Sequence, residues 1–370
     1  MALSKVDLAN QVENQLPQNL VANNLPFRNI IINGDMSIAQ RGTSASGITA
    51  TSYNTVDRFQ ILLNLLGTWT QSQSTDVPSG QGFSNSLKMD CTTANSSPAA
   101  GAFNTITTKF EGQNVQYLKK GTANAESTTL SFWVKSNKTG TYIAELQDAD
   151  NSRTISKSYT IDTADTWEKK TITYDGDTSG TLDNDNARSL QILFWLGAGS
   201  NYTSGTLQTS WGSETIANRV VGQVNLADST SNYINITGVQ LEAGTTASDF
   251  EFLPYDVNLQ RCQRYCYSAS AGDTYHAIMN GFFPNSTLYI GALNLPTSMR
   301  AGPSLTTSGS FQAAGITSYS ASGFTINDSN VNNVNTIQLR ATVSGATAGQ
   351  GANFRNDNDA TATFILSSEL

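Results

Sequence analysis

The sequence of 370 residues predicts an all-β protein, a jelly-roll β-sandwich followed by a short helix and a smaller C-terminal β-domain. Charged residues make up only 14% of the chain, well below the roughly 25% of an ordinary soluble domain. Ser, Thr, Asn and Gly supply the polar balance, which favours strands and turns because Thr fits a pleated surface while Asn and Gly accept positive φ. Apolar residues also recur with a period of two in many short stretches, as in half-buried strands.

The first 26 residues differ from the rest of the chain. They are polar, and Val6, Val12 and Leu16 form only one weak helical stripe, which Pro17 breaks. So few apolar groups cannot support independent folding. We therefore expect residues 1–26 to extend freely or to dock onto another protein.

A jelly-roll domain is expected over residues 27–254. The stretch NIIINGDMSIAQRG, residues 29–42, begins with a buried-strand signal over residues 29–32 and enters a turn at Asn-Gly-Asp. In two later stretches, TTLSFWVKS and SLQILFWLG, the apolar residues alternate along the chain: Leu130, Phe132 and Val134, then Leu190, Ile192, Phe194 and Leu196. Several short strands separated by turns over roughly 220 residues indicate a sandwich or jelly roll.

One of these strands carries an irregularity. In YINITGVQLEAG the apolar residues change face from Ile234 and Ile236 to Val239 and Leu241. One extra residue near Gly238 explains the change, which predicts a β-bulge there.

A short helix is expected to join this domain to the next, within residues 255–271. In DVNLQRCQRYCYS, about residues 256–268, Asp256 suits an N-cap, and one helical face holds Leu259, Cys262 and Cys266. Strands resume over residues 272–370, where Leu288 and Ile290 alternate before Pro296. Two later stretches each place apolar residues on one face: Ile337, Leu339, Ala341 and Val343, then Ala362, Phe364, Leu366 and Leu370.

Charge and hydropathy argue against several classes of protein. The net charge of −8 argues against a nucleic-acid partner, since phosphate binding needs clustered Lys and Arg. No run of about 18 apolar residues is present, so we expect no membrane insertion. The N-terminus lacks the apolar segment of a signal peptide, and we expect synthesis in a cytosol.

Candidate catalytic and metal-binding residues are sparse. His276 is the only histidine, so neither a multi-His metal site nor a Ser-His-Asp triad is expected. Asp175 and Asp177 resemble the start of a calcium loop, but Asn186 stands where the loop requires Glu, which favours a turn. No carboxylate pair is marked for glycoside hydrolysis. We expect no catalytic residue, metal or cofactor, and we expect buried apolar roles for Cys91, Cys262 and Cys266.

Aromatic side chains are the candidates for ligand binding, because their rings stack on the apolar faces of sugars while Asn, Asp and Gln bind hydroxyl groups. The loop 197–211 is long and polar and contains Tyr202 and Trp211. These two residues are predicted to bind a ligand, together with Trp69, and Trp195 is a further candidate. The tips of the C-terminal domain are an alternative place. The rings could instead fill the core or an oligomer interface.

Three stretches in order resemble a recurrent family of bacteriophage tail-fibre or virion-appendage proteins. They are NIIINGDMSIAQRGTS, then YNTVDRF (53–59), then ITGVQLEAGTTASDFEFLPYDVNLQRCQRYCYS (236–268). They carry the family's N-G-D start with a Q-R-G turn, its Y-x-x-D-R-[WF] strand, its V-Q-L-E-x-G strand and its C-Q-R-Y helix. The terminus FILSSEL is also similar. The resemblance covers about residues 27–268 well and the last 100 residues more loosely.

The segments LSFWVKS, TWEKKTITYDGDTSGT and GVQLEAG also resemble jelly-roll carbohydrate-binding modules. In those modules, the Asn-Gly-Asp start and the Gln-Leu-Glu end are neighbouring strands that close the sandwich. The resemblance implies that residues 29–42 begin the first strand and that residues 1–26 form an attachment peptide. Many such modules bind structural calcium through an acidic residue shortly after the first Asp. Ser37 and Ile38 stand there instead, so calcium is not expected at that place.

The family resemblance implies a structural virion protein, assembled in the cytoplasm of the host bacterium, that helps to recognise a host-surface glycan and is not an enzyme. Its partners would be other tail or capsid proteins, bound through residues 1–26, and further copies of itself. A trimer is expected, with a two-fold dimer as the alternative, because symmetric closure protects strand edges. Two other functions stay open: a polysaccharide-degrading tail enzyme and an architectural decoration without a ligand.

Overall fold

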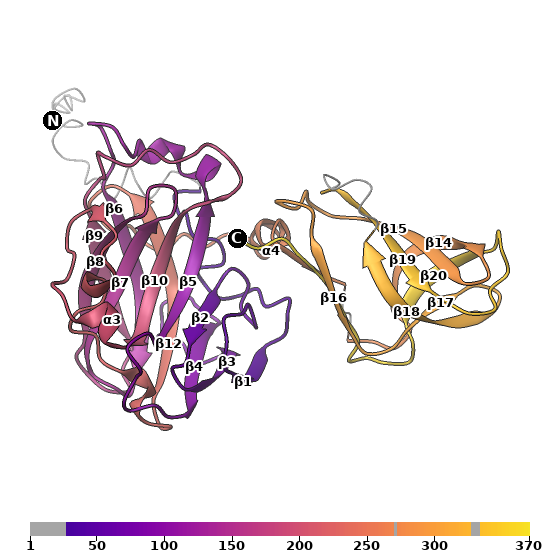
Figure 1. Ribbon diagram of the computed structural model, residues 1–370, viewed down its shortest axis with the longest axis horizontal. Coiled ribbons are helices and arrows are strands. Elements are labelled where there is room, and N and C mark those ends of the chain that lie inside the picture. The colour runs from indigo at the N-terminus through magenta and orange to yellow at the C-terminus, as the bar shows by residue number, and fades with distance from the viewer. Residues whose placement is uncertain (1–26, 270–271, 327–333) are drawn as a thin grey trace, which may run out of the picture. The chain divides into compact units, whose positions relative to one another are not determined.

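The computed structural model describes residues 27–269, 272–326 and 334–370 (Figure 1). The chain divides between Leu253 and Pro254 into two compact units. In both, the main elements are antiparallel strands, as the sequence predicts. Residues 1–26, the predicted attachment segment, lie outside the described residues. None of the described helices is long and apolar enough to span a bilayer.

The first unit is a sandwich of two six-stranded sheets. The first sheet has the order β1 (Ser44–Ile48), β3 (Thr68–Ser74), β4 (Ser86–Thr93), β12 (Tyr233–Ala243), β6 (Thr128–Ser136) and β9 (Glu168–Tyr174). The second has the order β11 (Gly212–Ser213), β8 (Arg153–Ile161), β7 (Gly140–Asp148), β10 (Arg188–Ala198), β5 (Phe103–Glu111) and β2 (Gln60–Asn64). Short helices lie in the connections: η1 (Gly112–Asn114), η2 (Gln116–Leu118), α3 (Ser200–Thr203), η3 (Ile216–Asn218) and η4 (Leu226–Asp228).

The core of this unit lies between the sheets and uses the predicted faces. One buried cluster contains the alternating residues of β6 and of β10: Leu130, Phe132 and Val134, and Leu190, Ile192, Phe194 and Leu196. The predicted bulge in β12 is also present. Its register against β6 shifts between Thr237 and Gln240, and Gly238 has a φ of 61°.

The opening stretch is not a strand, which corrects the prediction for residues 29–32. The segment lies beside β12, where Ile30 N donates to Leu241 O (2.9 Å) and Val239 N donates to Gly34 O (2.9 Å). The Asn29 side chain accepts from Leu241 N and donates to Val239 O. The Asn29 side chain therefore replaces part of a regular ladder, although the two motifs are neighbours as the resemblance implies.

The second unit begins with α4 (Tyr255–Gln263) and contains two sheets. A three-stranded sheet has the order β13 (Cys266–Ser268), β21 (Thr363–Ser367) and β16 (Ser304–Ser308). A closed barrel has the order β14 (Ala277–Asn285), β15 (Leu288–Asn294), β19 (Thr336–Thr342), β18 (Ser318–Ile326), β17 (Phe311–Ala314) and β20 (Gly351–Asn356). Predicted apolar faces of this unit are buried in one cluster, with Ile337, Leu339, Ala341 and Val343 from β19 and the residue after it, and Ala362, Phe364 and Leu366 from β21 and the residue before it.

Two details of this unit differ from the predictions. The helix ends at Gln263, because Cys266 pairs with Ser367 in β13, and Asp256 is not its N-cap, since the cap is Pro254. In β15 the buried side chains are Tyr289 and Leu293, whereas Leu288 and Ile290 are half-buried, because the Tyr289 ring packs against Phe283 inside the barrel.

Candidate functional site

The predicted ligand-binding residues occupy different environments. Trp69 is fully buried, and its Nε1 donates to Leu66 O at 2.7 Å. Trp69 is therefore a core residue, which corrects its predicted place on a binding surface. Trp195 is also buried, and its Nε1 donates to the Glu145 carboxylate at 2.8 Å.

Trp211 and Tyr202 are both half-buried, and the structure does not bring them together as one site. The Trp211 Nε1 donates to Asp175 O at 2.7 Å, and the Lys120 ammonium lies 4.6 Å from the ring centroid. The Tyr202 ring packs edge-on against Phe103, with centroids 5.5 Å apart. A ligand-binding role for Trp211 and Tyr202 remains a prediction.

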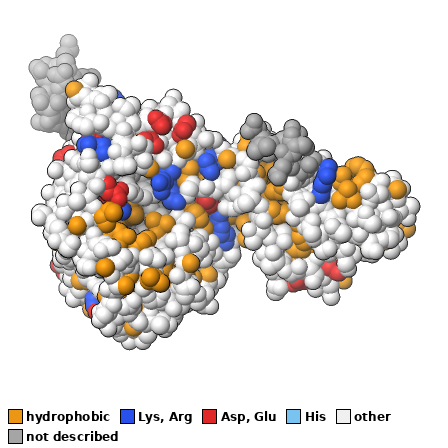
Figure 2. Space-filling model, viewed as in Figure 1, with side chains coloured by type: hydrophobic (Ala, Val, Ile, Leu, Met, Phe, Trp, Pro, Cys, Tyr) orange, Lys and Arg blue, Asp and Glu red, His pale blue; other side chains and the backbone are white. Residues whose placement is uncertain are grey.

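A larger candidate site is the outer face of the second sheet, the face that points away from the core. Because side chains alternate along a strand, the residues between the core positions of β10 belong to this face, and their cross-strand partners extend it over β5, β7, β8 and β2. Figure 2 shows apolar side chains beside acidic and basic ones over the part of the sandwich unit where β5, β10 and β7 lie in Figure 1.

One half of the outer face is covered by the segment 199–223. Trp195, Leu193 and Ile143 pack with Val220 of this segment in a separate apolar cluster. Arg219 places its Nε 2.9 Å from a Glu145 oxygen. Burial raises the pKa of Glu145, and the Arg219 charge opposes that effect. The outward side chains Ile143, Leu193 and Trp195 of this half are therefore buried.

Beside this half lies a polar row, defined here as Lys109, Gln191, Gln147 and Thr154, which are successive partners across β5, β10, β7 and β8. Gln147 is half-buried, and the other three side chains are buried. Neighbouring strands lie about 4.8 Å apart, so the row spans roughly 14 Å. The Gln191 Nε2 donates to Gln147 Oε1, and the Gln147 Nε2 donates to the Glu214 carboxylate. An amide bonded in this way still has a second N–H and a second lone pair for a further partner.

Aromatic and unpartnered polar groups border the row. The Lys109 ammonium lies 5.8 Å from the centroid of the half-buried Tyr53 ring. Several buried oxygen atoms of the outer face have no hydrogen-bond partner among the described residues: Gln60 Oε1, Thr105 Oγ1, Thr154 Oγ1, Ser156 Oγ and Ser189 Oγ. Buried polar atoms are costly when left unsatisfied. Thr105 and Ser156 lie in the half that the segment 199–223 covers, because they pair with Trp195 and Glu145.

The Asp-rich turn before β10 is held by cations of the chain. The Asp177 carboxylate accepts from Arg153 Nε at 2.7 Å and from Lys120 Nζ at 2.8 Å. Burial by itself would raise the pKa of Asp177, but hydrogen bonds from Arg153, Lys120 and the Ser179 N–H lower it overall. Across residues 27–269, 272–326 and 334–370, no three His, Cys, Asp or Glu side chains gather as metal ligands.

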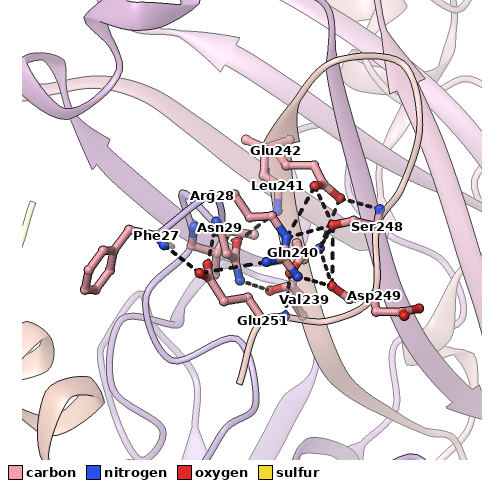
Figure 3. A network of polar contacts seen from close by, with 11 residues as sticks. Phe27, Arg28, Asn29, Val239, Gln240, Leu241, Glu242, Ser248, Asp249 and Glu251 are labelled. Carbon is pink, nitrogen blue, oxygen red and sulfur yellow. Dashed lines mark hydrogen bonds and ion pairs between the residues drawn. The ribbon is translucent and has the colours of Figure 1, made fainter. Parts of the chain in front are cut away.

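The motif residues of the family resemblance form a separate polar network, shown in Figure 3. The Glu251 carboxylate accepts from Phe27 N (2.5 Å) and Asn29 N (2.9 Å). The Glu242 carboxylate accepts from the N–H and the hydroxyl of Ser248. Glu251 thus fastens the start of the sandwich to its end, and Glu242 holds the turn after β12, so we assign both a structural role.

Sequence reasoning missed the polar row. The alternation in SLQILFWLG that placed Leu190 and Ile192 in the core also placed Gln191 on the opposite face. The position of Gln191 between two core residues was therefore the one sign of the row in the sequence. Its partners Lys109 and Gln147 could not be found in the same way, because cross-strand register is not encoded locally.

No protein-family model matches the chain, and no curated protein matches it. Among solved structures, the chain is similar to the enzymatically active domain of tailspike protein 4 from bacteriophage CBA120, with 16% identity over 59% of this chain and 22% of that chain and a TM-score of 0.31. It is similar to the CBM22-1 xylan-binding domain from Paenibacillus barcinonensis, with 11% identity over 57% of this chain and 100% of that chain and a TM-score of 0.25. A third similar structure is the N-terminal cellulose-binding domain of Cellulomonas fimi β-1,4-glucanase C, with 12% identity, 57% and 100% coverage and a TM-score of 0.27. The chain thus spans about a fifth of the tailspike chain, and at these identities and TM-scores the likenesses assign neither a family nor an activity.

Proposed function

We propose that this protein is a non-enzymatic component of a bacteriophage virion that binds a host-surface glycan through the polar row on the outer face of its second sheet. The observation that carries the binding proposal is the row itself, Lys109, Gln191, Gln147 and Thr154, of which Gln147 is the half-buried member. The segment 199–223 reaches the Thr154 end of the row, where β11 pairs with β8. The virion assignment rests on the ordered tail-fibre motifs of the sequence.

The chemistry of the row fits a neutral or weakly charged polysaccharide. Amides and hydroxyls exchange hydrogen bonds with sugar hydroxyls, and an aromatic ring at the border offers an apolar surface to the sugar C–H groups. Gln147 and Tyr53 are half-buried, so both can contact a ligand without unfolding. Four strands of the rigid sheet carry the row, which reduces the entropy lost on binding.

The test is glycan binding by single variants of the row. We expect purified protein to be retained on an array of bacterial lipopolysaccharides and capsules, and calorimetry with the retained glycan to show weaker binding for Gln147→Ala and Tyr53→Ala. One lost hydrogen bond reduces affinity roughly two- to tenfold. The control is Gln81→Ala, which removes an exposed amide outside the outer face.

Three results would contradict the proposal. Retention on no host glycan would favour an architectural role. Equal affinity of Gln147→Ala, Tyr53→Ala and the control would move the site away from the row. Steady release of oligosaccharide that stops on substitution of one carboxylate would instead identify a polysaccharide-degrading enzyme.

A further inference from the structure

A second concave site lies on the sandwich unit, beside η1 and η2. The pocket has a volume of about 390 Å³, and Val115 and Leu182 are the buried apolar side chains of its lining. Exposed polar side chains complete much of it, namely Lys119, Thr122 and Thr181. Ligand pockets range from about 300 to 1,000 Å³, so this one suits a ligand of about one sugar ring.

The two walls of the pocket are fastened together on both sides. On one side the Gln116 Nε2 donates to Leu182 O (3.3 Å) and Asp183 O (3.1 Å). On the other side Gly121 N donates to Asp177 O at 2.7 Å. Gly121 is needed at that contact, because a Cβ there would lie 2.4 Å from the Thr181 hydroxyl. The pocket is therefore preformed, and binding would lose little entropy to loop ordering.

The charges around the pocket favour an anionic group. No carboxylate lines it, while two lysines do. Lys120 is already held by Asp148 and Asp177, which are buried. Lys119 is different, because its partner Glu126 is 2.6 Å away in a pair whose side chains are 53% and 40% exposed.

An exposed ion pair contributes little to stability, because water and salt screen it. Lys119 can therefore leave Glu126 for a ligand carboxylate at small cost. A carboxylate bound to an ammonium at the mouth of a partly apolar pocket gains more than the same contact in open solvent.

We propose that this pocket binds a single acidic sugar residue, a hexuronic acid, with its carboxylate on Lys119 and its hydroxyls on Thr122 and Thr181. The site is separate from the polar row and stands whether or not the row binds a glycan.

The test compares D-glucuronate with D-glucose, which differ at C6 by the carboxylate. Amide chemical shifts of the full-length protein are followed during titration with each sugar at low and at high salt. We expect glucuronate to bind more tightly than glucose, and Lys119→Gln to weaken glucuronate binding roughly fivefold or more while leaving glucose unchanged. Lys169→Gln, which removes an exposed lysine on β9, should leave both sugars unchanged.

A second variant tests the cavity itself. Thr181→Tyr places a larger side chain in the pocket from an exposed position, so it should abolish binding of both sugars without unfolding the sandwich, whereas the exposed control Thr230→Tyr should not. Equal binding of glucuronate to the wild type, Lys119→Gln and Thr181→Tyr would overturn the proposal. So would the absence of glucuronate binding by a folded wild type. Loss of binding in Gln147→Ala alone would place the sugar on the polar row instead.

Discussion

The contacts of Trp211 favour a structural role over ligand binding. Its ring packs against the main core, its Nε1 donates to Asp175 O, and the Lys120 ammonium lies over the ring. A ring that stacks on a sugar needs one open face. Contacts of this number are typical of a side chain that stabilises the fold.

We predict that Trp211→Ala lowers the free energy of unfolding by about 2 to 3 kcal/mol, from lost packing, the lost hydrogen bond and the lost cation–π contact. Trp211→Phe keeps most of the packing and should cost less. Urea denaturation monitored by circular dichroism measures both variants. If Trp211→Ala keeps the wild-type unfolding free energy but loses glycan affinity, the ring is a ligand contact.

The burial of Trp69 and Trp195 shows where residue-level reasoning from sequence ends. A Trp suits a sugar-binding surface and a core equally well, and both roles need the same apolar ring with a polar N–H. In the structure both rings are buried, and each N–H has an acceptor within the protein: Leu66 O for Trp69 and the Glu145 carboxylate for Trp195.

At the scale of elements, β12 depends on a single glycine. The bulge in β12 moves the buried face from Ile236 to Val239, and Gly238 adopts the positive φ that this step requires. A Cβ at Gly238 would also lie 2.6 Å from the Phe83 ring. The positive φ of Gly238 and the close Phe83 ring therefore both disfavour any residue with a side chain at this position.

We predict that Gly238→Ala lowers the free energy of unfolding by about 2 to 4 kcal/mol, because it adds left-handed backbone strain and displaces the Phe83 ring. The matched control is Gly101→Ala, whose Cβ would meet only the Asn201 amide at 3.7 Å. Thermal or chemical denaturation compares the two. Equal stability of both variants would mean that β12 adjusts its register without cost.

The strands could be predicted from sequence because alternation is a local property of the chain. The faces of β6, β10 and β19 followed from it directly. The stretch 29–32 could not be predicted in this way, because its apolar run is typical of a strand whereas Asn29 supplies the hydrogen bonds from a side chain. The polar row could not be predicted either, since it depends on the pairing of four strands.

At the scale of the molecule, the two units differ in whether their main sheets have open edges. The barrel of the second unit is closed, whereas the sandwich sheets end at β1 and β9 and at β11 and β2. β11 covers only two residues of the nine in β8. Edges of this kind invite pairing with another chain unless something covers them.

We predict that the protein is a trimer in solution, as the tail-fibre resemblance implies and as symmetric closure over the sandwich edges would favour. Light scattering at micromolar concentration should give three times the chain mass of 39.6 kDa. Twice the chain mass would support the two-fold alternative, and the mass of one chain would refute self-association.

The fastening of residues 27–34 to residues 239–251 has a consequence for synthesis on the ribosome. Ile30 bonds to Leu241, and β12 lies in the middle of the first sheet, between β4 and β6. At about 5 to 20 residues per second, the partners of Ile30 emerge roughly 10 to 40 s after it does. During that interval the nascent sandwich lacks a central strand and exposes apolar surface that the folded unit buries. We therefore expect the unfinished chain to need protection from aggregation, as chaperones provide, until residue 251 has been made.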